Sequence, residues 1–251
     1  MKAIEVKNLC KSFGGVRAVN NVSFSIEVGE RQAIIGPNGA GKTTLLNLIG
    51  GLYHSDSGQI YLFNEDVTRL PDHRRIEFGV GRTFQLTSIF FDLSVLDNIL
   101  LALQAIKPYR FKMLRPQKTY RDLLDEAHRL LRQWNLLEKQ NTLIRELSYG
   151  EQRMIELMMG LASKPKILLL DEPTSGLSAA ESFYLADLIR ELGKEITLVI
   201  VEHDMDIVFS IASRIAVLYY GSVLVEGTPQ EISENKKVRE VYLGLKEDLE
   251  K

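Results

Sequence analysis

The chain has 251 residues, of which 45% are hydrophobic and 25% are charged, a composition typical of a globular protein with a sizeable core. Its formal net charge of -2 argues against nonspecific nucleic-acid binding as its main role. Its single cysteine, Cys10, excludes an internal disulfide framework. The longest apolar runs, 167–170 and 197–201, are far shorter than the ~18 residues that a transmembrane helix needs. We therefore expect a soluble protein, and any work at a membrane would need another chain to cross it.

The first part of the chain is predicted to form antiparallel strands. Short apolar alternation over residues 4–9 and 22–26 is interrupted at Gly14, and residues 58–63 show a similar strand-like pattern. Because alternation and glycine turns are typical of antiparallel hairpins, we expect a small antiparallel layer here.

A phosphate-binding loop lies between two parts of this layer. Residues 36–43 fit G-x-x-x-x-G-K-[ST] without a gap, after an expected strand at 32–35 and before an expected helix at 44–49. Glycines let backbone N–H groups surround a phosphate, Lys42 can reach the β- and γ-phosphates, and the Thr43 hydroxyl is placed to ligate Mg²⁺. A bare glycine turn is the alternative, but such turns seldom carry Gly-Lys-Thr at the start of a helix.

From residue 84 to about residue 161 the pattern becomes helical. Apolar residues recur at helical spacing over 95–103, after Ser94 as a plausible N-cap, and again over 123–134. Basic residues are scattered between these helices, and a solvated connector is favoured there over a contact with anionic lipid headgroups. They are Lys107, Arg110, Lys112, Arg115, Lys118 and Arg121.

The last third of the chain predicts parallel strands buried on both faces. The continuous apolar runs 167–170 and 197–201 are separated by an expected helix over 179–192, which is β-α-β wiring. A terminal hairpin at 215–226 and a helix opened by Thr228 follow. In such a doubly wound sheet, ligands bind at the carboxyl ends of the strands.

Polar residues follow both of these strands, where a ligand is expected. Asp171 directly follows the first run and is expected to hold Mg²⁺. Glu172 is next and can act as general base on the attacking water, the alternative being an exposed charge at a strand end. His203 follows the second run, and we favour a functional role in which it contacts the γ-phosphate or links the water, Glu172 and phosphate.

Gln85 lies where the sheet gives way to the helical region. Its amide can contact Mg²⁺ or the attacking water and report its position to a moving sub-domain. A lone glutamine is a weak signal, and its place between the two regions is what favours the role.

A second anion site is predicted at the start of a helix near residue 148. Ser148 and Glu151 form a capping box, which is a sufficient structural reason for both residues. A helix N-terminus that also carries a hydroxyl and the small Gly150 can instead bind an anion. If the two anion sites cannot meet in one copy, a head-to-tail dimer would bring them together.

These motifs, in this order, resemble the nucleotide-binding subunit of ABC transporters over essentially the whole chain. Residues 36–43 match Walker A, Gln85 the Q-loop, 147–151 the signature, 167–172 Walker B with the catalytic base, 175–178 the D-loop and His203 the switch histidine. Three residues depart from the common pattern, because Tyr149 replaces a glycine and Glu151 a glutamine in the signature, and Ser178 stands where the D-loop usually ends in aspartate.

The resemblance implies an α/β P-loop NTPase with a mostly parallel, doubly wound core sheet, an antiparallel β layer and an inserted helical sub-domain. Residues 1–85 and 162–251 would form the nucleotide-binding core and 86–161 the helical part. It also implies an ATP sandwich, in which Ser148, Gly150 and Ser178 of one subunit act in trans on the nucleotide of the other. The catalytic residues would be Glu172, His203 and Gln85, and the Mg²⁺ ligands Thr43, Gln85 and Asp171. The nucleotide would be bound by Phe13, under the adenine, and by Gly36, Pro37, Asn38, Gly39, Ala40, Gly41, Lys42, Thr43 and Thr44.

Finer features resemble the ATPases of branched-chain amino-acid uptake, namely residues 81–85, 93–98, 201–205 and 241–244. Urea and lipopolysaccharide-export ATPases share some of them and remain alternatives. The resemblance implies partner permeases and a second ATPase subunit, identical or a sister, at the inner face of the cell membrane, with no contact to the cargo or to nucleic acid. Residues 89–91 either line a groove for a permease helix or pack inside the helical sub-domain, with equal weight.

Two other classes are weaker. A soluble ABC ATPase acting on DNA or ribosomes usually has a long coiled-coil insertion or tandem cassettes, and neither is present in this sequence. A GTPase would be expected to carry the base-reading motif Asn-Lys-x-Asp. The pair Asn235-Lys236 does not fit this motif, because it continues with Lys237 and Val238.

Overall fold

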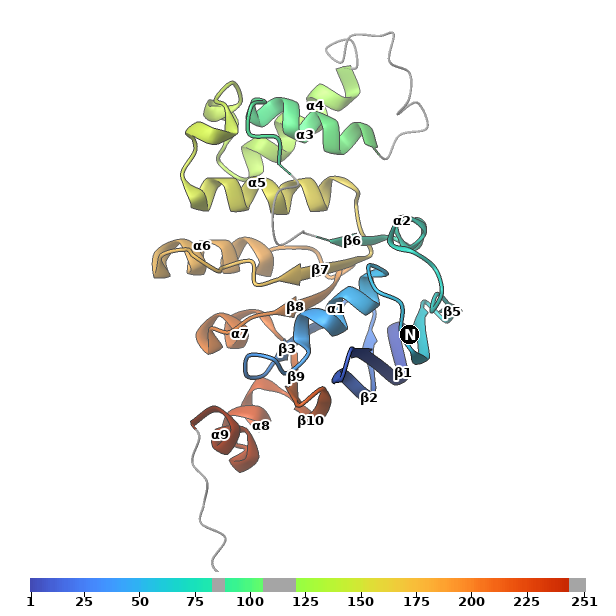
Figure 1. Ribbon diagram of the computed structural model, residues 1–251. Coiled ribbons are helices and arrows are strands. Elements are labelled where there is room, and N and C mark those ends of the chain that lie inside the picture. The colour runs from blue at the N-terminus through green and yellow to red at the C-terminus, as the bar shows by residue number, and fades with distance from the viewer. Residues whose placement is uncertain (83–88, 106–120, 244–251) are drawn as a thin grey trace, which may run out of the picture.

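The computed structural model describes residues 1–82, 89–105 and 121–243. Its centre is a six-stranded sheet in the order β10-β9-β3-β8-β7-β6, in which only β10 runs antiparallel to its neighbour (Figure 1). The strands of this sheet are β3 (Arg31–Ile35), β6 (Val80–Arg82), β7 (Ile167–Asp171), β8 (Thr197–Val201), β9 (Arg214–Tyr219) and β10 (Ser222–Gly227). The expected mostly parallel core sheet is confirmed.

A second, antiparallel sheet packs beside it. Its order is β2-β1-β4-β5, and its strands are β1 (Lys2–Phe13), β2 (Val16–Glu27), β4 (Ser57–Leu62) and β5 (Glu65–Asp66). The long β1 and β2 are joined by a tight turn at Gly14, and register shifts bend the ladder that they form. The expected antiparallel layer is therefore confirmed.

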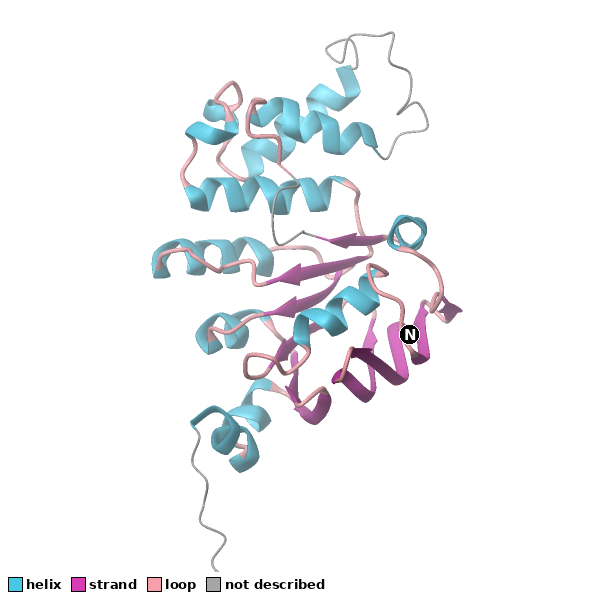
Figure 2. Ribbon diagram, viewed as in Figure 1, coloured by secondary structure: helices cyan, strands magenta, loops and turns pink. Residues whose placement is uncertain are grey.

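Helices cover both faces of the central sheet and form a separate layer at its β6 edge (Figures 1 and 2). The helices of this separate layer are α3 (Val95–Ala105), α4 (Arg121–Gln133) and α5 (Tyr149–Ala162). The other helices are α1 (Lys42–Gly50), α2 (Asp72–Arg75), α6 (Ala179–Arg190), α7 (Met205–Ile211), α8 (Pro229–Glu234) and α9 (Lys236–Leu243). Single 3-10 turns lie at Ile76–Phe78, Leu137–Lys139 and Ile144–Glu146.

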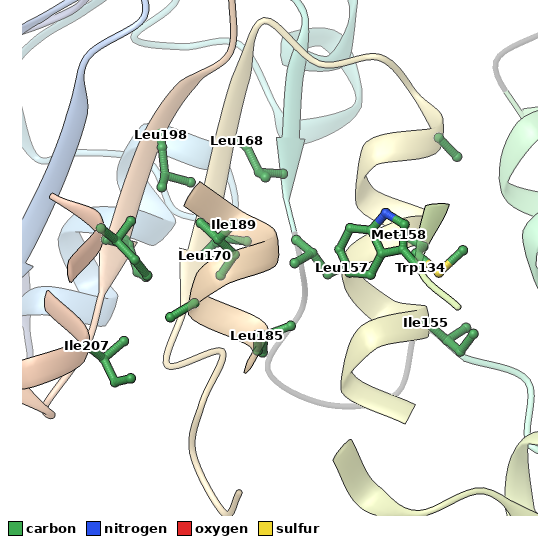
Figure 3. Packing of buried hydrophobic residues seen from close by; sticks show 14 of the residues in the cluster. Trp134, Ile155, Leu157, Met158, Leu168, Leu170, Leu185, Ile189, Leu198 and Ile207 are labelled. Atoms are coloured by element: carbon green, nitrogen blue, oxygen red, sulfur yellow. The ribbon is translucent and has the colours of Figure 1, made fainter. Parts of the chain in front are cut away.

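The buried apolar runs are explained by two cores, one on each face of the sheet. In β7, Leu168 and Leu170 face one core while Ile167 and Leu169 face the other, so every side chain of the run is covered. Figure 3 shows Leu168 and Leu170 beside residues of α6, with Trp134 and Met158 of the helical layer close by. Because β7 belongs to both cores, the strand end that carries Asp171 is held in a fixed place.

The helices begin and end close to the residues expected from the sequence. Ser148 caps α5 and Thr228 caps α8, each with the full capping box that was predicted. In the part of the chain that the structure describes, no helix combines the length and apolar character needed to cross a bilayer. Gln85 and most of the basic segment lie outside the described residues.

Candidate active site

The phosphate loop joins β3 to α1, as the motif requires. Gly36 and Gly41 have positive φ values of 151° and 99°, and a Cβ on either would meet a backbone carbonyl oxygen, at 2.2 Å from Leu218 and 2.1 Å from Ala18 respectively. Gly39 also has a positive φ, but a Cβ there would project into open space. The first and last glycines are therefore required by packing, and the middle one leaves room for a phosphate.

Lys42 folds back over this loop. Its Nζ donates hydrogen bonds to the carbonyl oxygens of Gly36, at 2.8 Å, and Pro37, at 3.1 Å. Burial lowers the pKa of Lys42, while the charges of Glu172 and Asp171 act to raise it. A buried ammonium held by two neutral carbonyls is well placed to exchange them for phosphate oxygens.

Asp171, at the carboxyl end of β7, meets Thr43 across the sheet edge. The Thr43 hydroxyl donates to Asp171 Oδ1 at 3.2 Å, and the guanidinium of Arg82 lies 3.8 Å from Oδ2. Within the described ranges, Oδ2 accepts no hydrogen bond although it is buried, and burial raises the pKa of Asp171. A hydroxyl beside an incompletely satisfied carboxylate fits a hard divalent cation.

Arg82 was not among the residues predicted from the sequence. Its guanidinium donates to Asn47 Oδ1 on α1 and lies near Asp171, so it joins the helix after the phosphate loop to the end of β7. Burial lowers the pKa of Arg82. The sequence carries no signal for this link, because the residues that Arg82 contacts are separated from it by 35 and 89 positions.

Glu172 and His203 face each other at the ends of neighbouring strands. Because β7 and β8 are paired with Asp171 opposite Val201, the residues that follow them are neighbours. His203 Nε2 lies 2.6 Å from Glu172 Oε1, and both side chains reach solvent, with exposures of 40% and 24%. Glu172 has a positive φ of 49°, a strained conformation for a non-glycine residue, and its N–H donates to Val201 O at 2.8 Å.

The signature and D-loop segments lie together in one copy of the chain. Ser148 caps α5 and Ser178 caps α6, each through a capping box. A Cβ on Gly150 would come within 2.6 Å of Glu181 Oε1, which places the two helix N-termini side by side. Among the described residues, no hydrogen bond or ion pair joins residues 148–151 to residues 36–44. Figure 1 shows α5 and α1 well apart, with α6 and β7 between them in the view, so the two predicted anion sites stay separate within one copy.

The family described as "ABC transporter" matches residues 19–175, more than half of the chain. The chain belongs to the ABC transporter family. A second family, described as "Branched-chain amino acid ATP-binding cassette transporter", matches residues 222–247.

Curated relatives of this ABC protein cover nearly its whole length. BraF of Pseudomonas aeruginosa, named a high-affinity branched-chain amino acid transport ATP-binding protein, is 37% identical and the match covers 96% of this chain and 97% of the relative. LivG of Escherichia coli has the same description and is 38% identical with the same coverage. LptB of Escherichia coli, named a lipopolysaccharide export system ATP-binding protein, is 32% identical over 97% of this chain and 98% of its own.

Solved structures of ATP-binding cassettes resemble this chain in fold. An ATP-binding cassette of an ABC transporter in its ADP conformation gives a TM-score of 0.87 at 29% identity, covering 98% of this chain and all of the other. A dimeric post-hydrolysis state of another ATP-binding cassette, bound to ADP and Pi, gives 0.75 at 29% identity, covering 90% and 98%. The protein is therefore a nucleotide-binding ATPase of the ABC family, whose hydrolysis is coupled to transport.

The aromatic residue predicted for the adenine lies at the end of β1. Phe13 is 44% exposed and its ring makes an edge-to-face contact with that of Tyr53, with 5.3 Å between ring centroids, while Lys11 Nζ lies 5.4 Å from the centroid of Phe13. Tyr53, in the loop after α1, was missed, because nothing in its local sequence pairs it with a residue 40 positions earlier. Phe13 and Tyr53 thus form an exposed aromatic pair at the end of β1.

A groove lies between the nucleotide-binding core and the helical layer. It encloses about 860 Å³, and its walls come from the end of α1, from α2, from β6 and from helices α3 and α5. Its lining includes Leu52, Ile76, Arg82, Ala102, Glu156 and Met159. Residues 89–91 are not part of this lining. Ile89 is in the core, as expected if the segment packs inside the helical sub-domain, whereas Phe90 and Phe91 are exposed, as expected if they face a permease helix.

Proposed function

We propose that this ABC ATPase drives the uptake of branched-chain amino acids through partner membrane permeases. Its relatives named for branched-chain amino acid transport are 34% to 39% identical, against 32% for the relative named for lipopolysaccharide export. The match of residues 222–247 to a family of branched-chain amino acid cassettes supports the same cargo. Lipopolysaccharide or urea transport remains the second candidate.

ATP is proposed to bind across the phosphate loop with its adenine against Phe13. Residues 36–44 would surround the phosphates through their backbone N–H groups and the N-terminus of α1. Lys42 would exchange its two carbonyl partners for β- and γ-phosphate oxygens, because a charged acceptor makes the stronger hydrogen bond.

Thr43, Asp171 and Gln85 are proposed to hold Mg²⁺. The buried Oδ2 of Asp171, with no hydrogen-bond partner among the described residues, and the adjacent Thr43 hydroxyl support this assignment for two of the three. Gln85 lies outside the described residues and is assigned from the sequence motif alone. Bound Mg²⁺ would neutralise charge on the phosphate oxygens.

Glu172 is the proposed general base, and its pairing with His203 is the observation that carries the catalytic assignment. At 2.6 Å the imidazole can hold the carboxylate in position, while the exposure of both side chains leaves them open to a water and a phosphate. The carboxylate would take a proton from the attacking water, and the imidazole would orient the carboxylate and contact the γ-phosphate.

A second ATPase subunit, identical or a sister, is proposed to complete the site. Ser148 and Gly150 at the N-terminus of α5 would cap the γ-phosphate held by the other subunit, and Ser178 would contact it nearby. The dimeric form of a structural relative supports this arrangement. The separation of residues 148–151 from the phosphate loop within one copy supports it as well.

The groove is proposed to receive a helix of the permease, which would hold the protein at the inner face of the membrane. Its apolar wall and its place between the two parts of the chain suit an amphipathic helix. Residues 86–161 would then move as one unit relative to residues 1–85 and 162–251 as the nucleotide changes.

An uptake assay that includes a variant at the proposed catalytic base tests this proposal. In cells of the native host with the gene disrupted, we expect labelled leucine uptake to fall and to be restored by the wild type but not by Glu172→Gln. Glu191→Gln, which changes an exposed glutamate at the end of α6, is the matched control and should restore uptake. Normal leucine uptake without the gene, with lipopolysaccharide export or urea uptake impaired instead, would reject the cargo assignment.

A further inference from the structure

Glu202 is a buried carboxylate between two segments of the catalytic site. It follows β8 and immediately precedes His203, and its side chain is only 3% exposed. Burying an ionised carboxylate is costly unless hydrogen bonds compensate it. The local sequence does not explain why a glutamate should occupy this place.

Among the described residues, the hydrogen bonds that the Glu202 side chain accepts come from the two loops that follow β7 and β8. Its Oε1 accepts from Thr174 N, at 2.9 Å, and from Thr174 Oγ1, at 2.7 Å, and its Oε2 accepts from the backbone N–H of His203, at 3.1 Å. Across the described ranges no lysine, arginine or histidine side chain forms an ion pair with it. Glu202 therefore joins the two loops by backbone and hydroxyl donors rather than by charge pairing.

Thr174 is itself fixed to the residues on either side of it. Its carbonyl accepts from Leu177 N at 3.1 Å, and Glu172 O accepts from Ser175 N at the same distance. These turns connect the base Glu172, through Thr174, to Ser178 at the start of α6. A shift of the D-loop would consequently move the atoms that Glu202 holds.

We propose that Glu202 is a positioning residue that couples the D-loop to the pair formed by Glu172 and His203. Its hydrogen bonds to Thr174 tie its carboxylate to the segment that leads to Ser178. Its hydrogen bond from the His203 backbone fixes the place at which the imidazole meets Glu172. When the second subunit contacts Ser178 of the first, the resulting shift of the D-loop would therefore change the geometry of Glu172 and His203 in the first subunit. This inference rests on the proposed function, and in particular on the closed dimer.

The test uses Glu202→Gln, which keeps the shape of the side chain. Whichever way the amide lies, its NH₂ group replaces an oxygen that accepts from a backbone N–H, of His203 or of Thr174, so one of these N–H groups loses its acceptor, although the Thr174 hydroxyl can still bond to the amide. We expect kcat to fall by about 10- to 100-fold, the size of effect expected for a misplaced catalytic group, with KM for ATP and the melting temperature unchanged. Thr174→Ser, which keeps the hydroxyl, should retain kcat, while Thr174→Val should lower it.

The double variant Glu202→Gln/Thr174→Val separates coupling from simple loss of stability. We expect its kcat to match that of the worse single variant, because both changes break the same bridge. Wild-type kcat in folded Glu202→Gln, or strictly multiplicative effects of the two changes, would overturn the inference. If Glu202→Gln does not fold, wild-type kcat in Thr174→Val overturns it, and a lowered kcat with unchanged KM, restored in Thr174→Ser, supports it.

Two further variants distinguish failure of this inference from failure of the proposed function. If Glu172→Gln and Ser148→Ala both stop hydrolysis while Glu202→Gln does not affect it, only the role of Glu202 is rejected. If hydrolysis continues in Glu172→Gln, the proposed site itself is rejected, and the role of Glu202 with it.

Discussion

The ring of Tyr149, the first residue of α5, lies against Gly176 in the D-loop, where an added Cβ would come within 3.0 Å of Tyr149 Cε1. The Tyr149 hydroxyl accepts hydrogen bonds from Arg153, which also pairs with Glu156 one turn further along. Tyr149 stands where the common family pattern has glycine. In this protein the substituted residue packs the signature helix onto the D-loop of the same subunit.

Gly176→Ala should therefore lower stability through two effects. Gly176 has a φ of +81°, and the new methyl would press on the Tyr149 ring. We expect a loss of about 2–4 kcal/mol in the free energy of unfolding, combining left-handed strain with overpacking, measured by urea denaturation. Gly14→Ala is the control, because Gly14 has a φ of +55° and no atom within 4 Å of an added Cβ. Equal losses in the two variants would contradict the Tyr149 contact.

Removing the charge of Asp171 should stabilise the nucleotide-free protein at neutral pH. Burial raises the pKa of Asp171 above its usual 3.8, so the folded state binds more protons than the unfolded state between the usual and the raised values. The free energy of unfolding consequently falls as pH rises through that window and stays lower above it. We expect Asp171→Asn to melt at a higher temperature than the wild type at pH 7, with the difference shrinking as pH falls through the window.

Asp187→Asn provides the control for this prediction. Asp187 forms an exposed ion pair with Arg190, and such pairs contribute little. The melting temperature of Asp187→Asn should stay near that of the wild type both at pH 7 and as the pH falls through the same window. A lower melting temperature for Asp171→Asn at pH 7 would show that its contacts with Thr43 and Arg82 outweigh the burial.

Phe13→Ala should weaken ATP binding by about 10-fold or more, the usual cost of losing a base-stacking aromatic. A fluorescent ATP analogue competed by ATP measures this directly. Tyr53→Ala should have a smaller effect, because Tyr53 supports the Phe13 ring by an edge contact. Unchanged ATP affinity in Phe13→Ala would remove this residue from the adenine site.

Arg75→Met should be strongly destabilising. The Arg75 side chain is fully buried, and it donates to the carbonyl oxygens of Leu48 and Ile49 in the last turn of α1, and to those of Leu70 and Thr68. Burial lowers its pKa to about 10. The substitution would remove all four hydrogen bonds, and among the described residues only Leu48 O would keep a donor, the Gly51 N–H at 3.2 Å, so we expect a loss of about 3–5 kcal/mol on chemical denaturation. Arg74→Met changes an exposed neighbour and should cost less than about 0.5 kcal/mol.

The sequence predicted the parts of the site that depend on short spacing. Asp171, Glu172 and His203 were predicted to lie together because each follows a continuous apolar run, and the structure confirms the two parallel strands whose carboxyl ends bring them to one edge of the sheet. The capping residues Ser148 and Thr228 were found because a capping box is a local pattern with its own hydrogen bonds. The structure confirms those elements.

What the sequence did not predict depends on contacts between distant segments. Tyr53 beside Phe13, Arg82 beside Asp171, and the bridge from Glu202 to Thr174 each join residues at least 28 positions apart. Arg75 had no signal either, since a buried arginine has the same local pattern as an exposed one. For residues 89–91 the sequence left two alternatives open, because an apolar triplet does not say which of its members faces the core; Ile89 is buried, whereas Phe90 and Phe91 are exposed.

The most direct test of the account is the oligomeric state of Glu172→Gln with Mg²⁺ and ATP, measured by analytical ultracentrifugation. We predict a stable dimer with ATP bound and no turnover, and a monomer when Ser148→Ala is added, since the signature serine of one copy would then no longer cap the phosphate held by the other. A Glu172→Gln protein that binds ATP yet remains monomeric, or that still hydrolyses ATP, would contradict it.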